Sequence, residues 1–397
     1  MNLTILGSTG TIGKNTLSVI NKIDKKINIF ALTAKSNIKT LYSQIKQFKP
    51  EYAVVLNLKD AGKLATKCKK NKIKTKILSG RNNYNFVASH IKVHCVLSAI
   101  VGAAALEPTY SAVKKGKKIL LANKESLIMS GSLMMNEAKK NKALIIPVDS
   151  EHNAIFQILS SSGLEYNHLG ISCSGDIKTI TLTASGGPFL GLSKKRLSKV
   201  TPKEATCHPT WKMGKKISVD SASMMNKGLE IIEAAILFRL KSSQIDVLLH
   251  PQSIVHGLVT FSDGSTISHM SNHDMRIPIS YALSWPKRFK LRINSKVENI
   301  LDNLTFKKIK PGSYKCLDLC IKALKIGKNA PTVLNAANEI AVDNFLQNKI
   351  KFIDIPVIID KALKVMPIKK FNNIKSILKC DFETREYIKS YIEKKWK

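Results

Sequence analysis

The sequence predicts an α/β protein that begins with a mostly parallel sheet, continues as an α+β domain and ends in helices. Three observations support this order. The chain has 397 residues, more than the roughly 250–300 at which a single core stops growing. Short apolar runs alternate with helix-length segments at the start, and helical periodicity replaces this pattern toward the end. We therefore expect domains at 1–149, 150–285 and 312–397, with a connector at 286–311.

The first domain is predicted from its apolar runs. Runs of about four to eight β-prone residues separated by helix-length segments are typical of βαβ units, which build mostly parallel sheets. These runs lie at residues 3–6, 27–32, 52–56, 93–99, 119–122 and 144–148.

The pattern changes after residue 150. A turn rich in glycine and serine at 185–188 interrupts it, and His-Pro pairs at 208–209 and 250–251 mark further loops, as expected of an α+β domain that carries its function on loops. A basic, irregular stretch then runs to about Pro311. Beyond residue 313, apolar residues recur at helical spacing. The two stripes are Leu317, Cys320, Ile321 and Leu324, and then Ala336, Ile340, Asn344 and Phe345.

Composition indicates a globular protein without a membrane span. Hydrophobic residues make up 44% of the chain, and no apolar run approaches the roughly 20 residues that cross a bilayer. The first residues enter a strand pattern without the basic segment of a signal peptide, so a cytoplasmic location is expected. The seven cysteines are an odd number without C-x-x-C spacing, and we expect buried free thiols rather than disulfides or a zinc site.

The formal net charge of +36 raises the question of a polyanionic partner. A nucleic-acid-binding protein is one interpretation, and specific binding at physiological salt would support it. However, the basic residues are spread along the chain, and they form no basic motif interleaved with aromatic residues. We favour a lysine-rich solvated surface that helps to attract phosphorylated small molecules, with no nucleic-acid or membrane partner.

A glycine-rich loop, G-S-T-G-T-I-G at 7–13, follows the first predicted strand and opens a helix. Its backbone N–H groups and the helix N-terminus can face a pyrophosphate. We therefore expect a Rossmann-like domain that binds a dinucleotide. The G-x-x-G-x-x-G spacing is less specific than G-x-G-x-x-G, and the alternative is a turn that merely needs glycines. The expected cofactor contacts are Gly7, Thr9, Gly10, Thr11 and Ile12.

The end of the second predicted strand indicates which cofactor is bound. NAD sites commonly place an acid there to bind the ribose hydroxyls, and this carboxylate would repel a 2′-phosphate. The chain has Lys35, Ser36 and Asn37 instead. A cation, a hydroxyl and an amide suit the 2′-phosphate, so NADP is favoured.

Carboxylates near a strand end and on a helix predict a metal site. Asp149 and Glu151 leave a strand, and an extended chain would point both to one side. Asn226 and Glu230 lie i,i+4 on one predicted helical face, with Lys227 beside them. Together these groups suit Mg²⁺ or Mn²⁺. The alternative is that the acids only cap helices in solvent.

Asn123, Lys124 and Glu125 follow another predicted strand, at the edge where open α/β sheets bind ligands. Lys124 can therefore reach the substrate, and Asn123 and Glu125 can position the nicotinamide half of the cofactor. The alternative is that all three are ordinary exposed polar residues.

Seven motifs resemble those of the 1-deoxy-D-xylulose 5-phosphate reductoisomerase family, in the family's order and across all three predicted domains. They are G-S-T-G-T-I-G at 7–13, L-L-A-N-K-E-S at 120–126, P-V-D-S-E-H-N-A-I-F-Q at 147–157, S-G-G-P-F at 185–189, H-P-T-W-K-M-G-K-K-I-S-V-D-S-A-S-M-M-N-K-G-L-E at 208–230, H-P-Q-S at 250–253 and L-N-A-A-N-E at 334–339.

The resemblance implies rearrangement of 1-deoxy-D-xylulose 5-phosphate to a branched aldehyde, which NADPH then reduces to 2-C-methyl-D-erythritol 4-phosphate for isoprenoid synthesis. It also implies a homodimer. Asp149, Glu151 and Glu230 would hold Mg²⁺ or Mn²⁺, with Co²⁺ as a further candidate, and these acids and Lys124 would be catalytic. The implied substrate-binding residues are Lys124, Ser150, Glu151, Ser185, His208, Trp211, Ser221, Asn226, Lys227 and Glu230.

The segment 208–214 resembles the mobile lid of the family. Trp211 would cover the substrate and Gly214 would lie near the cofactor, so that closure excludes water from the aldehyde. The alternative for Trp211 is a place in the core. For His152, His250 and His256, a structural role is at least as well supported as a catalytic one.

Two positions depart from the family pattern. A loop that often reads A-G-K-N is A-K-S-N at 34–37, which shifts the basic residue by one and leaves its contact to the 2′-phosphate open. A turn that usually reads P-D-M-R begins with His273 here, so any packing contribution of the proline is in doubt. The runner-up function is another metal- and NADP-dependent dehydrogenase of a phosphorylated sugar or hydroxy acid. Turnover of 1-deoxy-D-xylulose 5-phosphate would separate the two.

Overall fold

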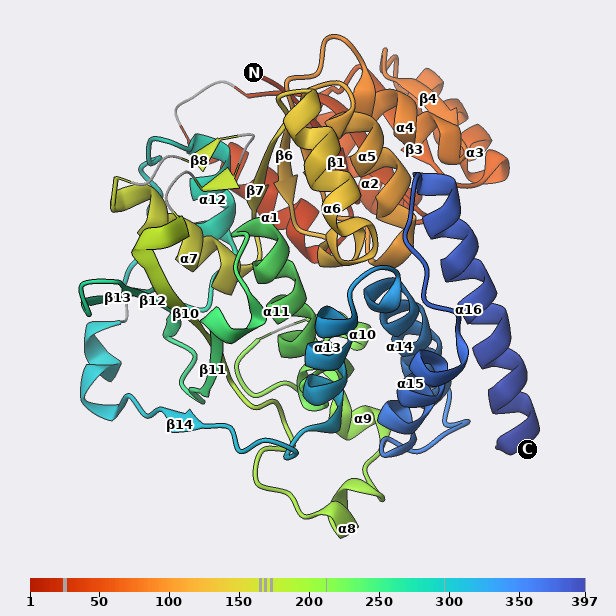
Figure 1. Cartoon of the computed structure of the whole chain (residues 1–397). Coiled ribbons are helices and arrows are strands. Elements are labelled where there is room, and N and C mark those ends of the chain that lie inside the picture. The colour runs from red at the N-terminus through yellow and green to blue at the C-terminus, as the bar shows by residue number, and fades with distance from the viewer. Residues whose placement is uncertain are drawn as a thin grey trace.

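Two sheets organise the molecule in the computed structural model, which describes residues 1–23, 27–163, 166–167, 170–171, 174–211, 213–295 and 297–396. A seven-stranded sheet comes from the N-terminal part and a five-stranded sheet from the middle of the chain. The C-terminal helices lie below the first sheet and to one side of the second in the view of Figure 1.

The first sheet is wholly parallel and has the strand order β4-β3-β2-β1-β5-β6-β7. The order reverses between β1 and β5, and ligands bind at the carboxyl ends of strands at such a switch point. The strands are β1 (Asn2–Leu6), β2 (Asn28–Ala34), β3 (Tyr52–Val55), β4 (Lys76–Ser79), β5 (Cys95–Ser98), β6 (Lys118–Leu121) and β7 (Leu144–Pro147). They are joined by α1 (Thr11–Ile20), α2 (Ile38–Phe48), α3 (Leu58–Lys70), α4 (Arg81–Ser89), the 3₁₀ turn η1 (Gly102–Ala105), α5 (Leu106–Val113) and α6 (Lys124–Lys140).

The predicted α/β class is confirmed, and each of the six predicted runs overlaps a strand of this sheet. The sequence analysis missed β4. This strand lies at the edge of the sheet, and its four residues are exposed or only partly buried. An edge strand needs fewer apolar residues because it is covered less, so it gives a weak signal.

The second sheet has the order β13-β12-β10-β11-β14, in which β10 and β11 pair in parallel and the other pairs are antiparallel. Its strands are β10 (Ile177–Ala184), β11 (Ile245–Leu249), β12 (Val255–Phe261), β13 (Thr266–Met270) and β14 (Lys307–Lys308). The stretch predicted to be an irregular connector therefore supplies a strand, because β14 pairs with β11, and it also holds the 3₁₀ helix η4 (Glu298–Asn303). Two shorter strands, β8 (Tyr166–Asn167) and β9 (Gly170–Ile171), pair with each other.

Helix α7 (Ser150–Ser161) packs against the second sheet. A Cβ at Gly257 in β12 would lie 2.8 Å from Cδ1 of Ile155, so the close packing at this point requires glycine. The central part of the chain also forms the 3₁₀ helices η2 (Ser174–Asp176) and η3 (Ser242–Gln244), with α8 (Lys194–Leu197), α9 (Pro202–Ala205), α10 (Lys215–Ala222), α11 (Met225–Leu237) and α12 (Arg276–Ser284).

The C-terminal part is helical, as its periodicity predicted. It consists of α13 (Lys315–Ile326), α14 (Ala330–Leu346), α15 (Asp354–Val365) and α16 (Ile374–Lys395). Helix α13 approaches α11 so closely that a Cβ at Gly228 would lie 2.5 Å from Sγ of Cys320. The members of the two predicted stripes are buried or partly buried.

The cysteines largely follow the prediction of buried free thiols. Cys207 is the exception, because it lies exposed in the loop after α9. Cys173 lies outside the described residues. The buried thiols are those of Cys68, Cys95, Cys316, Cys320 and Cys380.

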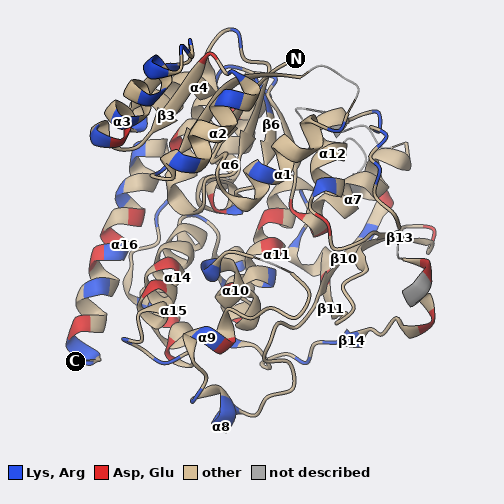
Figure 2. Ribbon diagram, turned by 180° about the vertical axis from the view of Figure 1, so that it is seen from behind, with Lys and Arg blue, Asp and Glu red and all other residues tan. Residues whose placement is uncertain are grey.

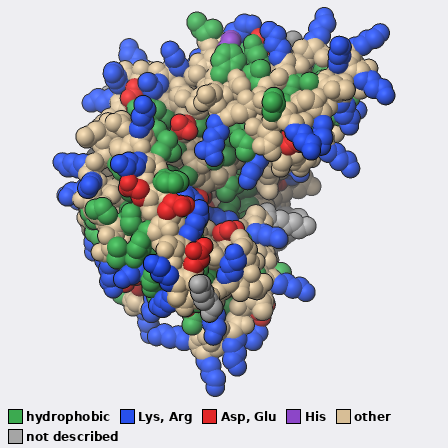
Figure 3. Space-filling view, turned by 90° about the vertical axis from the view of Figure 1, so that its right-hand side faces the viewer, with side chains coloured by type: hydrophobic (Ala, Val, Ile, Leu, Met, Phe, Trp, Pro, Cys, Tyr) green, Lys and Arg blue, Asp and Glu red, His purple; other side chains and the backbone are tan. Residues whose placement is uncertain are grey.

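The surface reflects the basic composition. Figure 2 shows Lys and Arg distributed over many elements rather than gathered on one, and Figure 3 shows them around the whole outline of one face. Among the described residues, no helix has both the length and the apolar composition needed to cross a bilayer.

Candidate active site

The glycine-rich loop lies at the switch point between β1 and β5. Gly7 has a φ of +84°, and a Cβ there would lie 2.6 Å from the carbonyl oxygen of Ala99, just after β5. A Cβ at Gly13 would lie 2.5 Å from the carbonyl oxygen of Gly7. Gly10 is different, because the only neighbour a Cβ would meet is that same oxygen, at 3.5 Å. Packing therefore does not require glycine at this exposed position, which begins α1 and suits the approach of an anion.

The other expected cofactor residues surround this helix start. Thr11 is exposed, and Thr9 and Ile12 are partly exposed. Lys35, Ser36 and Asn37 follow β2 and are all exposed. The side-chain oxygen of Asn37 accepts a hydrogen bond from the backbone N–H of Thr40 and caps α2, so the Lys35 and Ser36 side chains stand at a fixed helix entrance.

Asn123 and Glu125 are buried, which excludes the alternative that they are ordinary exposed residues. Asn123 caps α6 by accepting a hydrogen bond from the N–H of Ser126 (2.9 Å). Its Nδ2 donates to Oε2 of Glu125 (2.8 Å) and to the carbonyl oxygen of Gly102 (3.2 Å). The other oxygen of Glu125 pairs with Nζ of Lys216 at 2.9 Å.

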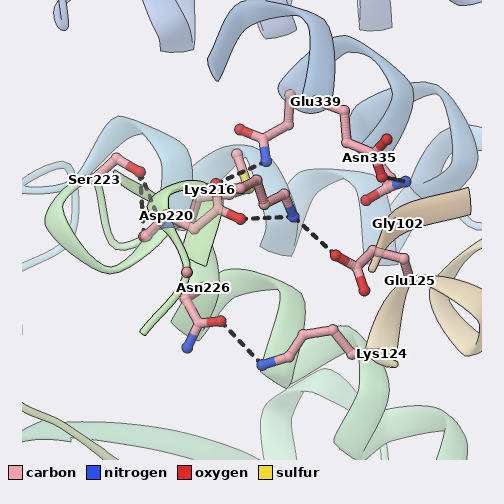
Figure 4. A network of polar contacts seen from close by, with 12 residues as sticks. Gly102, Lys124, Glu125, Lys216, Asp220, Ser223, Asn226, Asn335 and Glu339 are labelled. Atoms are coloured by element: carbon pink, nitrogen blue, oxygen red, sulfur yellow. Dashed lines mark hydrogen bonds and ion pairs between the residues drawn. The ribbon is translucent and has the colours of Figure 1, made fainter. Parts of the chain in front are cut away.

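Lys124 belongs to a cluster of acids and lysines. Its Nζ lies 2.7 Å from Oδ2 of Asp149, 3.1 Å from Oε1 of Glu230 and 3.0 Å from Oδ1 of Asn226, and Figure 4 shows the contact with Asn226. Nζ of Lys227 lies 3.0 Å from Oε1 of Glu151 and also pairs with Glu230. Glu230 is only 1% exposed, so a buried carboxylate lies between two ammonium groups. The sequence analysis predicted these residues to share one site.

The expected reason for the approach of Asp149 and Glu151 was wrong. Strand β7 ends at Pro147, Asp149 is the N-cap of α7, and Glu151 lies in the first turn of that helix. A helical turn rather than an extended chain therefore places the two acids. The positive end of the helix dipole favours carboxylates at this position, and Ser150 Oγ donates to Oε2 of Glu151 at 2.7 Å.

Carboxylates outnumber the cationic side chains of the cluster. Four acids meet two lysines and one histidine here: Asp149, Glu151, Glu230 and Glu233 against Lys124, Lys227 and His152. Burial and then the neighbouring Asp149 and Glu151 carboxylates raise the pKa of Glu230. Among the described residues, ligand atoms of Asp149, His152 and Glu230 lie within 4.8 Å of one another, and Oδ1 of Asp149 has no hydrogen-bond partner. This excess of acids fits a divalent cation.

His152 is fully buried beneath the acids and is placed to orient them. Its Nε2 donates to the carbonyl oxygen of Glu230 at 2.9 Å. Its Nδ1 lies at ion-pair distance from Asp149 (3.3 Å) and Glu233 (3.5 Å), beyond good hydrogen bonding. Burial opposes its charge, but the carboxylates of Glu233, Asp149 and Glu230 outweigh burial and raise its pKa to about 9. Because Nε2 is held by the carbonyl oxygen of Glu230 and Nδ1 faces two carboxylates, the geometry suits His152 to orienting the acids.

Glu233 is the acid that the sequence analysis missed. It lies one helical turn beyond Glu230 on α11 and is also 1% exposed. An acid three residues after a predicted ligand, within an otherwise apolar helix, was the signal that would have found it.

Three further predicted substrate-binding residues, Ser185, His208 and Ser221, lie near one another. Nδ1 of His208 accepts hydrogen bonds from the backbone N–H groups of Thr210 and Trp211. Nε2 therefore carries the proton and donates to Ser185 Oγ at 3.0 Å. A Cβ at Gly187 would lie 2.9 Å from the carbonyl oxygen of Ser221, which brings the turn after Ser185 against α10.

Trp211 does not lie in the core. It is partly exposed, and its ring contacts those of His273 (centroids 5.4 Å apart) and His256 (6.2 Å). Lys212 lies outside the described residues, and Gly214 is the exposed N-cap of α10. His250 is structural, since Nδ1 donates to the carbonyl oxygen of Thr305 and Nε2 accepts from two backbone N–H groups.

Comparison with known proteins agrees with this arrangement. A family model described as 1-deoxy-D-xylulose 5-phosphate reductoisomerase matches residues 3–131, and models of C-terminal domains of this enzyme match 145–238 and 270–387. The 1-deoxy-D-xylulose 5-phosphate reductoisomerase of Blochmanniella pennsylvanica (strain BPEN) is 47% identical over 97% of this chain and 98% of its own. The chain belongs to the 1-deoxy-D-xylulose 5-phosphate reductoisomerase family. The reductoisomerase of Laribacter hongkongensis (strain HLHK9) is 44% identical over 97% of this chain and 98% of its own.

Solved reductoisomerases share the whole fold. A DOX-P reductoisomerase in complex with NADPH, fosmidomycin and magnesium has a TM-score of 0.92 at 40% identity, covering 99% of this chain and 98% of that chain. The Zymomonas mobilis reductoisomerase in complex with NADPH has a TM-score of 0.89 at 35% identity, with the same coverage of both chains. The predicted family is confirmed, and the chain is a reductoisomerase-family enzyme.

Proposed function

We propose that this reductoisomerase rearranges 1-deoxy-D-xylulose 5-phosphate and reduces the product with NADPH to 2-C-methyl-D-erythritol 4-phosphate, in the non-mevalonate route to isoprenoids. The observation that carries the proposal is the cluster in which Lys124 contacts Asp149, Asn226 and Glu230 within 3.1 Å. Relatives solved with NADPH, magnesium and fosmidomycin support the same ligand classes here. In this proposal residues 1–149 bind the cofactor and 150–285 bind metal and substrate.

Asp149, Glu151 and Glu230 would hold Mg²⁺, with Mn²⁺ and Co²⁺ as alternatives. When bound, such an ion polarises the ketone and hydroxyl oxygens of the substrate as a Lewis acid. The converging carboxylates and the unpartnered Oδ1 of Asp149 support this assignment. His152 would keep Asp149 and Glu230 in place through contacts to both.

Lys124 would act as a fixed cation beside the reacting oxygens. Burial disfavours its charge, but Asp149 and Glu230 outweigh burial, and the pKa of Lys124 lies well above its usual value. It therefore remains protonated and donates hydrogen bonds. An ammonium held in this way stabilises negative charge on a substrate oxygen as it develops and does not act as a base.

The phosphate and hydroxyl groups of the substrate would be bound by a mixture of neutral donors and one cation. His208 suits this role, because burial lowers its pKa and it presents a neutral Nε2–H toward Ser185. The proposed residues are Ser150, Ser185, His208, Ser221, Asn226 and Lys227.

The cofactor would lie along the carboxyl ends of β1, β2 and β6. Its pyrophosphate would face the start of α1 at Gly7, Thr9, Gly10, Thr11 and Ile12, and its 2′-phosphate would meet Lys35, Ser36 and Asn37. Asn123, Glu125 and Gly214 would hold the nicotinamide, which would supply the hydride for the reduction. Trp211 would close over the substrate and exclude water.

In the deciding experiment, the purified protein is incubated with 1-deoxy-D-xylulose 5-phosphate, NADPH and Mg²⁺. The oxidation of NADPH is followed by the loss of its absorbance, and the product is identified. Formation of 2-C-methyl-D-erythritol 4-phosphate is expected. NADPH oxidation only with another phosphorylated sugar or hydroxy acid would favour the alternative dehydrogenase. We also propose that the protein is a cytoplasmic homodimer and has no nucleic-acid partner. Sedimentation tests the dimer, and filter binding across salt concentrations tests for nucleic-acid binding.

A further inference from the structure

A ring of polar contacts joins the proposed nicotinamide site to the C-terminal helices (Figure 4). Lys216, in the first turn of α10, is its centre. Its Nζ lies 2.9 Å from Oε1 of Glu125 and 2.7 Å from Oδ2 of Asp220. The other oxygen of Asp220 accepts a hydrogen bond from Nδ2 of Asn338, in α14, at 2.9 Å. One lysine thus connects α6 with α10, and Asp220 connects α10 with α14.

The ring closes through Gly102. Asn123 donates to both Glu125 and the carbonyl oxygen of Gly102. Gly102 has a φ of +74°, and a Cβ there would lie 2.9 Å from Oε1 of Glu339, so the Glu339 carboxylate rests against this glycine. Glu339 follows Asn338 directly in α14. The same helix therefore contacts the cofactor side of the molecule at two points.

Helix α16 supports this end of α14. Arg385 pairs with Oε2 of Glu339 at 2.6 Å and with Asp381 on its own helix at 2.7 Å. Nδ2 of Asn335 donates to Oε1 of Glu339 at 3.2 Å. Asn335, Asn338 and Glu339 all belong to the L-N-A-A-N-E segment at 334–339, which no step of the proposed reaction uses.

The ring is shielded from water, so its geometry is costly to disturb. The side chain of Lys216 is 18% exposed, that of Glu125 7% and that of Asp220 2%. A buried carboxylate that loses its cation is left uncompensated and must move or take up a proton. Lys216 also lies two residues after Gly214, the N-cap of α10. The Lys216–Glu125 pair therefore fixes the end of the proposed lid against the start of α6.

We propose that Lys216 is a positioning residue for the cofactor: by bridging Glu125 and Asp220, it lets α14 hold Asn123, Glu125 and Gly214 in register around the nicotinamide. The proposal rests on the proposed function, because that function assigns these three residues to NADPH. It gives the C-terminal helices a part in cofactor binding, although they contribute none of the assigned contacts.

The test compares Lys216→Met with Lys215→Met, the exposed neighbour on the same helix. NADPH affinity is measured by fluorescence titration, without substrate or turnover. We expect Lys216→Met to weaken NADPH binding by about 10–100-fold, by analogy with the loss when residues that orient metal ligands are removed. The rise in melting temperature caused by NADPH should shrink. Lys215→Met should match the parent, and Lys216→Arg should recover part of the affinity. Equal NADPH affinity in Lys216→Met and Lys215→Met would overturn the proposal.

Two further variants separate positioning from general stability. In a Glu125→Gln background, Lys216→Met should weaken NADPH binding far less than in the parent, because the two residues act through one contact. Additive losses would count against the proposal. Glu339→Gln tests the C-terminal arm, even where Lys216→Met fails to fold, and should also lower NADPH affinity, with unchanged affinity as the contrary result. A parent protein that binds NADPH but does not convert 1-deoxy-D-xylulose 5-phosphate refutes the proposed function instead.

Discussion

The rings of Trp211 and His273 meet edge to face, with centroids 5.4 Å apart and an interplanar angle of 70°. Nε2 of His273 donates to the carbonyl oxygen of Gln252 at 2.8 Å, which fixes the imidazole. The turn at 273–276 usually begins with proline in this family. Here Trp211 of the proposed lid packs on the hydrogen-bonded imidazole of His273. A histidine ring therefore takes the place of the family's proline beneath the lid.

Removal of the indole tests the lid. Trp211→Ala should lower kcat/KM. The expected loss of transition-state stabilisation is about 2–4 kcal/mol, the usual effect of truncating an aromatic side chain. Steady-state kinetics measure this loss, and Phe382→Ala, an exposed aromatic on α16, is the matched control. Limited proteolysis at 208–214 should slow when NADPH and fosmidomycin are present. Equal cleavage with and without these ligands would mean that the segment does not order on binding.

Glu230 is the most buried of the three proposed metal ligands. Glu230→Gln should reduce activity by about a hundredfold or more, since even the partners that orient metal ligands are worth 10–100-fold. Calorimetric titration should show weaker Mn²⁺ binding, whereas NADPH affinity stays close to that of the parent. A chelator should abolish the activity of the parent, and added Mg²⁺ should restore it. Added Mg²⁺ should not restore activity to Glu230→Gln. Asp246→Asn, at an exposed position on β11, is the control, and unchanged Mn²⁺ affinity in Glu230→Gln would reject the ligand assignment.

We expect the cofactor preference to depend on the exposed residues after β2. The parent should prefer NADPH over NADH, and Ser36→Asp should narrow or reverse this preference because the new carboxylate repels the 2′-phosphate. The measurement is kcat/KM for both cofactors. Ser43→Asp adds the same charge at an exposed position on α2 and should leave the ratio unchanged. Equal kcat/KM for the two cofactors in the parent would contradict the assignment.

His256 gives a pH dependence with a defined sign. Burial lowers its pKa to about 4, against roughly 6.5 in an unfolded chain. Between these values the unfolded chain takes up a proton that the folded protein does not, so stability falls as pH falls. From pH 7 to pH 5 this amounts to about 2 kcal/mol.

Denaturant unfolding at both pH values checks this prediction. His256→Gln should lose about 2 kcal/mol less than the parent on acidification. Burial and then His256 lower the pKa of the neighbouring His269 to about 4, so His269→Gln and the double variant are needed to separate the two contributions. His94→Gln, an exposed histidine, should behave as the parent does. If the parent and His256→Gln lose the same free energy of unfolding on acidification, His256 does not cause the pH dependence.

Much of this molecule was predictable from local sequence. The order of strands and helices and the grouping of Lys124, Asp149, Glu151 and Glu230 near one another follow from apolar periodicity and from motifs at strand ends. Strand β4 was missed because an edge strand carries few apolar residues. Glu151 was wrongly predicted to lie on an extended chain, because α7 begins soon after β7 ends.

Other site features depend on tertiary packing and leave little local trace. Glu233 meets His152 only because α7 lies against α11, and Lys216 meets Glu125 across 91 residues of sequence. No single window of sequence contains either pair. The Trp211–His273 contact was equally hidden, because the two residues come from separate loops.

The contact between Asp220 and Asn338 joins residues 118 positions apart, and this separation has a consequence during synthesis. Chains emerge from the ribosome N-terminus first, and early segments fold as units before later ones exist. All seven strands of the first sheet have been made by residue 147, long before α14. A nascent chain stalled between these points would hold its strands while Asp220 and Gly102 lack their partners from α14. If α14 positions the cofactor residues as proposed, the chain reaches its full NADPH affinity only after α14 has been synthesised, and not when the first sheet forms.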